Sequence, residues 1–124
     1  MRAARDLLAG PAGVTAVLTG NDRCAVGMLD TLRRAGVDVP GEISVVGYDD
    51  SRLARLTHID LTSVAQDVGK TTQLAVGALV ERLEGHEGAP PRDVLLDPRI
   101  VTRGTTGPAP VSYTHLTLPT ILLV

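Results

Sequence analysis

The sequence has 124 residues, of which 44% are hydrophobic and 2% aromatic. This length supports one small domain with a modest core and excludes a complete two-domain protein with a cleft. The formal net charge of −2 provides no basic surface for nucleic acid, and few aromatic side chains are available for stacking. A single cysteine excludes a disulfide framework, and no run of 18 apolar residues indicates a transmembrane helix.

The first half of the chain alternates between strand-like and helix-like segments. Residues 2–8 suggest a short helix, and residues 14–18 form an apolar run typical of a buried strand. The next helix is predicted from apolar residues at helical spacing, with Asn21 or Asp22 at its N-cap and Gly36 at its end. The apolar positions are Ala25, Met28, Leu29 and Leu32. Residues 43–47 predict a second strand, and residues 61–65 a third.

The second half begins with a longer helix, predicted from about residue 67 to residue 84. One face of this helix is apolar and consists of Val68, Thr72, Ala75, Val76, Leu79 and Leu83. Residues 94–96 and 100–102 predict two short final strands. Apolar strands separated by helices are typical of a parallel sheet covered on both faces, so the predicted fold class is α/β.

The last residues differ in composition from the rest of the chain. Residues 111–120 contain no Arg, Asp or Glu, although charged residues make up 21% of the sequence. One interpretation is a weakly ordered natural terminus. The decapeptide also resembles a translated sequencing-library adapter, so we expect residues 111–124 to be a non-native tail. The source nucleotide sequence would distinguish the two interpretations.

Motifs for catalysis or metal binding are weak. Residues 69–72 (Gly-Lys-Thr-Thr) resemble the end of a phosphate-binding loop, but Val64 stands where that loop needs Gly, and the lysine falls inside a predicted helix. Residues 49–51 could form an acid–base cluster, yet adjacent side chains on an extended segment point apart. Cys24 and His58 have no metal-spaced partners. We therefore expect no enzyme activity, no metal and no cofactor.

Two polar segments each follow a predicted strand. Asn21 and Asp22 follow the first strand, and residues 48–50 (Tyr-Asp-Asp) follow the second. Because ligands of open α/β sheets bind beyond the carboxyl ends of strands, these side chains can converge on one ligand. Amide and carboxylate groups together suit a ligand rich in hydroxyl groups. Helix capping and a simple turn explain the same residues, and spacing alone leaves both interpretations open.

A series of motifs, taken in order, resembles the lactose/galactose repressor family. The matching segments are residues 19–22 (Thr-Gly-Asn-Asp), 25–27, 32–40, 43–50 (Ile-Ser-Val-Val-Gly-Tyr-Asp-Asp), 61–66, 83–85 and 101–106. The resemblance covers about residues 3–110, and the ordered series is more specific than any single motif.

This resemblance implies an incomplete type I periplasmic-binding-protein fold, in which an effector binds between two α/β subdomains joined by three crossovers. Residues 1–63 would belong to the C-terminal sensor subdomain. Residues 64–92 would cross into the N-terminal subdomain as a strand and a helix, and residues 93–110 would return. The helix-turn-helix head, the hinge helix and most of the N-terminal subdomain would precede Met1.

The resemblance also implies roles for individual residues. The effector-binding positions are Asn21, Asp49, Gln66, Val68 and Thr71. Asp22, as a helix cap, Tyr48 and Asp50 would be structural residues near the site. Val26, Leu53 and Leu56 would contribute to a dimer interface. A bulky aromatic residue is frequent at the position of Val68, so its absence leaves the identity of the effector open.

The function implied is the effector-sensing segment of a cytoplasmic transcriptional regulator. Its partners would be a small-molecule effector such as a sugar, a second copy of the regulator, and operator DNA bound through the upstream head, with no membrane involved. The effector would shift the population between two arrangements of the subdomains. The alternative is a secreted sugar-binding protein of an uptake transporter. An upstream helix-turn-helix or an upstream signal peptide would distinguish the two.

Overall fold

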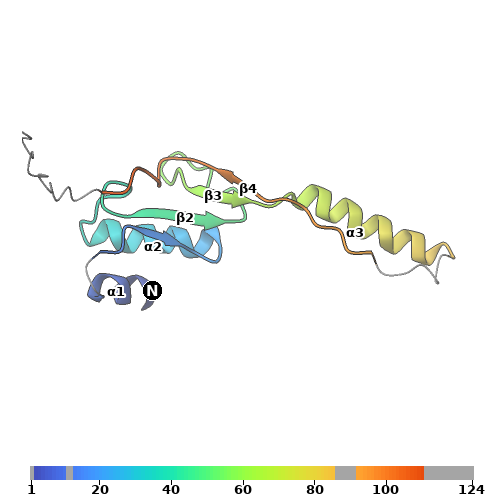
Figure 1. Ribbon diagram of the computed structural model, residues 1–124, viewed down its shortest axis with the longest axis horizontal. Helices are drawn as coiled ribbons and strands as arrows, with labels where there is room; N and C mark the ends of the chain where they lie inside the picture. The colour runs from blue at the N-terminus through green and yellow to red at the C-terminus, as the bar shows by residue number, and fades with distance from the viewer. Residues whose placement is uncertain (1, 11–12, 86–91, 111–124) are drawn as a thin grey trace, which may run out of the picture.

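A computed structural model describes residues 2–10, 13–85 and 92–110 (Figure 1). The predicted tail, residues 111–124, lies outside these ranges. The elements in chain order are α1 (Arg2–Ala9), β1 (Ala16–Leu18), α2 (Asp22–Arg34), β2 (Ser44–Tyr48), β3 (Thr62–Ala65), α3 (Val68–Leu83) and β4 (Arg99–Val101). Each element starts and ends close to its predicted position, except that β1 begins later than predicted. Helices and strands alternate along the chain, so the predicted α/β class is confirmed.

The four strands form one sheet in the order β1-β2-β3-β4. The first three are parallel, with Val17 opposite Val45 and Gly47 opposite Ser63. β4 runs antiparallel to β3, with Ile100 opposite Val64, so the sheet is mixed rather than wholly parallel. The cause is the path of the chain: it leaves the sheet at the end of β3, passes through α3, and returns to the same end (Figure 1).

The core lies between α2 and the sheet. The four apolar positions that predicted α2 are buried, with exposed fractions between 0 and 7%. They pack with Val45 of β2, Ala4 of α1, and Ala54 and Leu61 of the segment between β2 and β3. α2 packs on β2 and α1 packs on α2. In the part of the chain that the structure describes, α1 and α2 pack together beside the sheet, α3 does not, and the covering of both faces by helices that the sequence predicted is not present.

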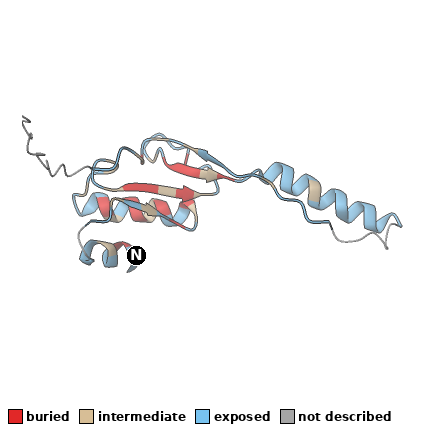
Figure 2. Cartoon of the chain, viewed as in Figure 1, coloured by how far each residue is buried: buried red, intermediate tan, exposed pale blue. Residues whose placement is uncertain are grey.

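α3 lies apart from this core. Figure 1 shows it projecting from the end of the sheet, and Figure 2 shows it exposed except at one half-buried position, Leu74. None of its residues is buried, and Val76, Leu79 and Leu83 on its apolar face are 53%, 58% and 78% exposed. The helix therefore forms as predicted, but nothing among the described residues covers its apolar face.

The strand predicted at residues 94–96 is not present. These residues run beside α3 without strand structure, and Leu95 is 92% exposed. A strand needs a neighbouring strand to pair with its backbone groups, and within the described ranges none lies alongside this segment. Residues 94–96 have the apolar composition typical of a strand, but composition does not predict whether a neighbouring strand is there to pair with them.

The segment after β4 is joined to the middle of the sheet by buried hydrogen bonds. The Thr105 hydroxyl donates to the Val45 carbonyl over 2.7 Å and accepts from the Thr62 backbone N–H over 2.9 Å. The Val45 N–H in turn donates to the Thr105 carbonyl over 2.8 Å. Further along, the Gly107 N–H donates to the Ser44 hydroxyl over 3.2 Å. Residues 103–107 are therefore part of the sheet layer, although they form no strand.

Candidate functional site

The centre of the site is a sharp turn after β2. Asp49 and Asp50 both have positive φ angles, +110° and +46°, in a region that non-glycine residues rarely adopt and that Asp tolerates better than most. The Asp49 N–H donates to the Val64 carbonyl over 2.9 Å, which ends the pairing of β2 with β3. The turn thereby places two consecutive carboxylates at the carboxyl end of the sheet.

The two carboxylates of this turn have different environments. The Asp49 side chain is exposed, and its Oδ1 accepts a hydrogen bond from Gln66 Nε2 over 3.2 Å. The Asp50 side chain is 5% exposed and pairs with Arg103 over 2.6 Å and with Arg55 over 2.8 Å. Asp49 is thus available to a ligand, whereas Asp50 is fully engaged within the protein.

The ion pairs decide the ionisation of Asp50. Burial by itself raises the pKa of a carboxyl group, because it disfavours the charged form. The hydrogen bonds and positive charges of Arg103, and then of Arg55, outweigh burial and lower the pKa of Asp50 below its usual value. Asp50 is therefore a carboxylate at neutral pH.

Asp22 is a buried structural residue and does not cap α2, so its prediction as the helix cap is wrong. The N-cap is Asn21, whose Oδ1 accepts a hydrogen bond from the Cys24 backbone N–H over 2.9 Å. Asp22 is 1% exposed, and its two oxygens accept from the Ser51 N–H and the Ser63 hydroxyl, each over 2.6 Å. A Cβ at Gly47 would lie 2.3 Å from Asp22, so glycine in β2 makes room for this carboxylate.

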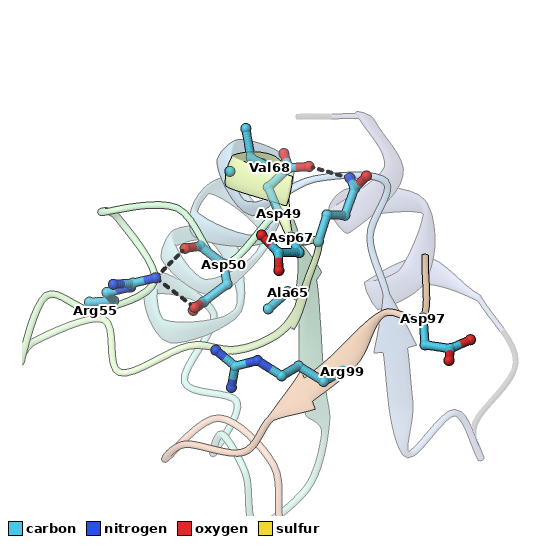
Figure 3. Close-up of a pocket in the computed structure, with 10 residues that line it drawn as sticks. Asp49, Asp50, Arg55, Ala65, Asp67, Val68, Asp97 and Arg99 are labelled. Carbon is cyan, nitrogen blue, oxygen red and sulfur yellow. Dashed lines mark hydrogen bonds and ion pairs between the residues drawn. The ribbon is translucent and has the colours of Figure 1, made fainter. Parts of the chain in front are cut away.

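A hollow of about 440 Å³ lies where the sheet meets α3 (Figure 3). It is open to solvent and charged, and its walls come from the turn after β2, the end of β3, the start of α3, and β4. Its lining residues are Asp49, Asp50, Arg55, Ala65, Gln66, Asp67, Val68, Gly69, Asp97 and Arg99. Three predicted effector-binding residues, Asp49, Gln66 and Val68, therefore share one hollow.

A second hollow of about 540 Å³ lies beside the same turn. Asn21 and Asp49 both line it, together with Leu53. Asp49 is thus common to both hollows and brings Asn21, 28 positions earlier, and Gln66, 17 positions later, around one carboxylate. The Asn21 Oδ1 caps α2, and the position of Asn21 beside this hollow agrees with both interpretations, helix cap and ligand contact.

Thr71 is not brought to the turn. It lies on α3 beside a third hollow, formed with residues 92–96, and its hydroxyl donates to the Asp67 carbonyl over 2.8 Å. Of the other predicted positions, Leu53 lines the second hollow, and Tyr48, Val26 and Leu56 line neither hollow beside the turn. Tyr48 ends β2 and is half-buried, Val26 is half-buried on α2, and Leu53 and Leu56 are 36% and 41% exposed.

The sequence did not predict a role in the site for three residues that support the turn: Ser63, Arg55 and Arg103. Ser63 reads as an ordinary strand residue, and Arg103 follows the last strand, 53 positions after its partner Asp50. No spacing rule joins residues so far apart.

Within the described residues, no helix is long and apolar enough to cross a membrane. In the same ranges, no group of three or more His, Cys, Asp or Glu side chains could hold a metal ion.

Comparison with known proteins defines the class of this fold. A family model described as a periplasmic binding protein-like domain matches residues 1–106. The crystal structure of a LacI transcriptional regulator from a Rhodococcus species has a TM-score of 0.80 and 45% identity, covering 87% of this chain and 39% of that one. The complex of the transcriptional regulator CelR with cellobiose has a TM-score of 0.77 and 33% identity, covering 84% and 32%. The chain therefore has a partial periplasmic-binding-protein-like fold.

The family within this class follows from the relatives. The HTH-type transcriptional regulator MalR of Streptomyces coelicolor is 41% identical over 96 residues, which are 77% of this chain and 28% of MalR. The chain belongs to the LacI family, the lactose/galactose repressor family, and covers part of its effector-binding domain. It spans little more than a quarter of the length of this relative. Because these relatives are transcriptional regulators, they support the interpretation as part of a regulator over the interpretation as part of a secreted sugar-binding protein.

Proposed function

We propose that this segment forms one wall of the effector site of a DNA-binding regulator, and that Asp49 is its principal ligand contact. The observation that carries the proposal is the position of the Asp49 carboxylate, exposed between two hollows and hydrogen-bonded to Gln66. Gln66 presents its amide group to the first hollow and Asn21 to the second, and Asp49 lines both hollows. Carboxylate and amide groups in one open hollow recognise a ligand with several hydroxyl groups.

A neutral sugar is the ligand class we propose. A carboxylate accepts hydrogen bonds from hydroxyl groups, and an amide both donates and accepts, so the two together match adjacent hydroxyls of a sugar ring. The similar regulator CelR holds cellobiose in its solved structure. Val68 and the rest of the start of α3 would contact the less polar parts of the ligand, at the junction of the sheet and the helix.

Regulation would follow from closure of the hollow. It lies between the sheet and α3, so a ligand that contacts both Asp49 and Val68 favours one arrangement of these parts. In the complete regulator, which we propose acts in the cytoplasm as a dimer on operator DNA, that preference would alter DNA binding. The exposed Leu53 and Leu56, with Val26, would contribute to the dimer contact.

The test is the substitution Asp49→Ala in the full reading frame that contains this sequence. Binding of a panel of neutral mono- and disaccharides, cellobiose included, is measured by titration calorimetry. Removing a charged hydrogen-bond acceptor from the site should weaken binding at least about tenfold, and Asp49→Asn should weaken it less. Operator binding without sugar should stay intact in both variants.

The matched control is Asp30→Ala. Asp30 is an exposed carboxylate on α2, paired with Arg34, and it lines neither hollow beside the turn. Its loss should leave sugar binding unchanged. Equal affinities of Asp49→Ala and the unsubstituted protein for every sugar that binds would remove Asp49 from the site.

A further inference from the structure

The side chain proposed to contact the ligand is not held in place by its own burial. Asp49 is exposed, and one hydrogen bond, from Gln66, reaches its carboxylate. Its backbone is held in a positive-φ conformation that is costly for a non-glycine residue. Such a conformation persists where the surrounding contacts fix it, so the position of Asp49 depends on what holds the next residues of the turn.

The next two residues of the turn are held by buried hydrogen bonds. The Asp50 N–H donates to the Ser63 hydroxyl over 3.0 Å, and that hydroxyl donates to Asp22 over 2.6 Å. The Ser51 N–H donates to the other oxygen of Asp22 over 2.6 Å. Ser63 is 0% exposed and Asp22 is 1% exposed, so solvent does not replace these contacts. The backbone of the turn is therefore joined to both β3 and α2.

Arg103 joins the turn to the segment that follows β4. One guanidinium nitrogen donates to the Asp50 carboxylate over 2.6 Å, and the other donates to the Leu61 carbonyl over 2.7 Å. The Arg103 side chain is 15% exposed, whereas Arg55, the other partner of Asp50, is 63% exposed. Because its planar guanidinium is mostly buried and is also held by the Leu61 carbonyl, Arg103 is the partner that orients Asp50.

We infer that Arg103 and Ser63 are positioning residues for effector binding, which fix Asp50 and its neighbours so that the adjacent Asp49 carboxylate faces the hollow. The inference rests on the proposed role of Asp49. It adds that the segment returning from α3 influences the position of Asp49 through the ion pair between Arg103 and Asp50. Ligand affinity then depends on two side chains that line neither hollow beside the turn.

The experiment uses Arg103→Lys and Ser63→Ala in the full reading frame, with Arg34→Lys as the matched surface control. Affinity for the tightest-binding sugar of the panel is measured with Asp49 and again in the Asp49→Asn background. Exchange of the Asp50 and Ser51 amide hydrogens and the midpoint of thermal unfolding are measured for each variant. Ser63→Ala removes one hydroxyl without changing charge, and it is the second variant if Arg103→Lys does not fold.

With Asp49 present, each positioning variant should bind sugar about tenfold more weakly and exchange the two amides about tenfold faster, the effect expected from losing one buried hydrogen bond. In the Asp49→Asn background the loss of affinity should largely disappear, because the effect acts through Asp49. Arg34→Lys should change none of these quantities.

Two results would overturn the inference. One is unchanged exchange of the Asp50 and Ser51 amides, and the other is an equal loss of affinity in both backgrounds, which indicates a merely structural role. Failure of the proposed function gives a different pattern. In that case Asp49→Asn itself leaves sugar affinity unchanged, or no sugar binds, while the exchange measurement still decides whether Arg103 and Ser63 hold the turn.

Discussion

α2 and α3 have similar apolar patterns and opposite environments. In α2 the apolar residues Ala25, Met28, Leu29 and Leu32 are at most 7% exposed, because β2 and α1 cover them. In α3 the apolar residues Val76, Leu79 and Leu83 are more than half exposed (Figure 2). An amphipathic pattern therefore predicts a helix and the side that needs cover, but it does not say which part of the protein provides that cover.

The difference also separates two roles in this chain. The sheet with α2 is a packed body that fixes the turn bearing Asp49. α3 joins that body through residues 66–67 and 92–98, next to the charged hollow (Figure 3). The chain spans 28% of MalR. In this segment by itself, the uncovered apolar face of α3 is an aggregation hazard.

The largest expected effect comes from deleting core volume in the packed region. Leu29 is 1% exposed, so Leu29→Ala should lower the free energy of unfolding of the 124-residue chain by about 3 kcal/mol. Leu79 is 58% exposed, so Leu79→Ala, the same deletion on α3, should cost less than about 0.5 kcal/mol. Urea unfolding of both variants measures the difference. Comparable losses would mean that α3 is covered in solution.

An intermediate effect is expected from the ion pair beneath the turn. The pKa of Asp50 is lowered in the folded protein, so its ionised form stabilises the fold at pH values above the unfolded pKa of about 3.9. That contribution is lost as the pH falls through the lower, folded pKa. The stability advantage of the unsubstituted chain over Asp50→Asn, from urea unfolding at several pH values, should be largest near neutral pH and shrink below about pH 4.

As a control, the stability difference between the unsubstituted chain and Asp50→Asn is measured at two salt concentrations. The pair Arg103–Asp50 is mostly buried, so added salt should change the difference little. A stability difference that stays constant from neutral to strongly acidic pH would contradict the assigned ionisation of Asp50.

The smallest effects are expected from exposed ion pairs in both regions. Arg34 pairs with Asp30 on α2, and Arg92 pairs with Glu81 of α3; all four side chains are more than half exposed. Arg34→Ala and Arg92→Ala should each change the free energy of unfolding by no more than about 0.5 kcal/mol. A loss above about 1 kcal/mol for Arg92→Ala alone would show that the segment beside α3 contributes to packing.

Local patterns predict most of the elements of the fold. The spacing of apolar residues locates α2 and α3, and short strand-like segments rich in apolar residues locate β2 and β3. What local patterns cannot supply is pairing: residues 94–96 have strand-like composition but no neighbouring strand among the described residues, and β4 takes its direction from the path of the chain. Composition determines what a segment can form, and the remainder of the fold determines whether it does.

The candidate site is predictable to the same degree. The rule that parallel strands end at one edge, together with the family resemblance, brings Asn21 and Asp49 together from the sequence alone. The role of Asp22 does not follow in this way, because a buried carboxylate and a helix cap look identical in sequence. Arg103 does not follow either, because its partner is 53 positions away and only the folded chain brings the two together.

The hydrogen bonds of Thr105 set an order of events during synthesis. A nascent chain that has reached Ala65 contains all three parallel strands, but the native partner of the Val45 and Thr62 N–H groups, Thr105, is not yet outside the ribosome. Because contacts 60 and 43 positions apart close large loops, this step is slow compared with formation of α2. The sheet is therefore completed only after translation has passed α3.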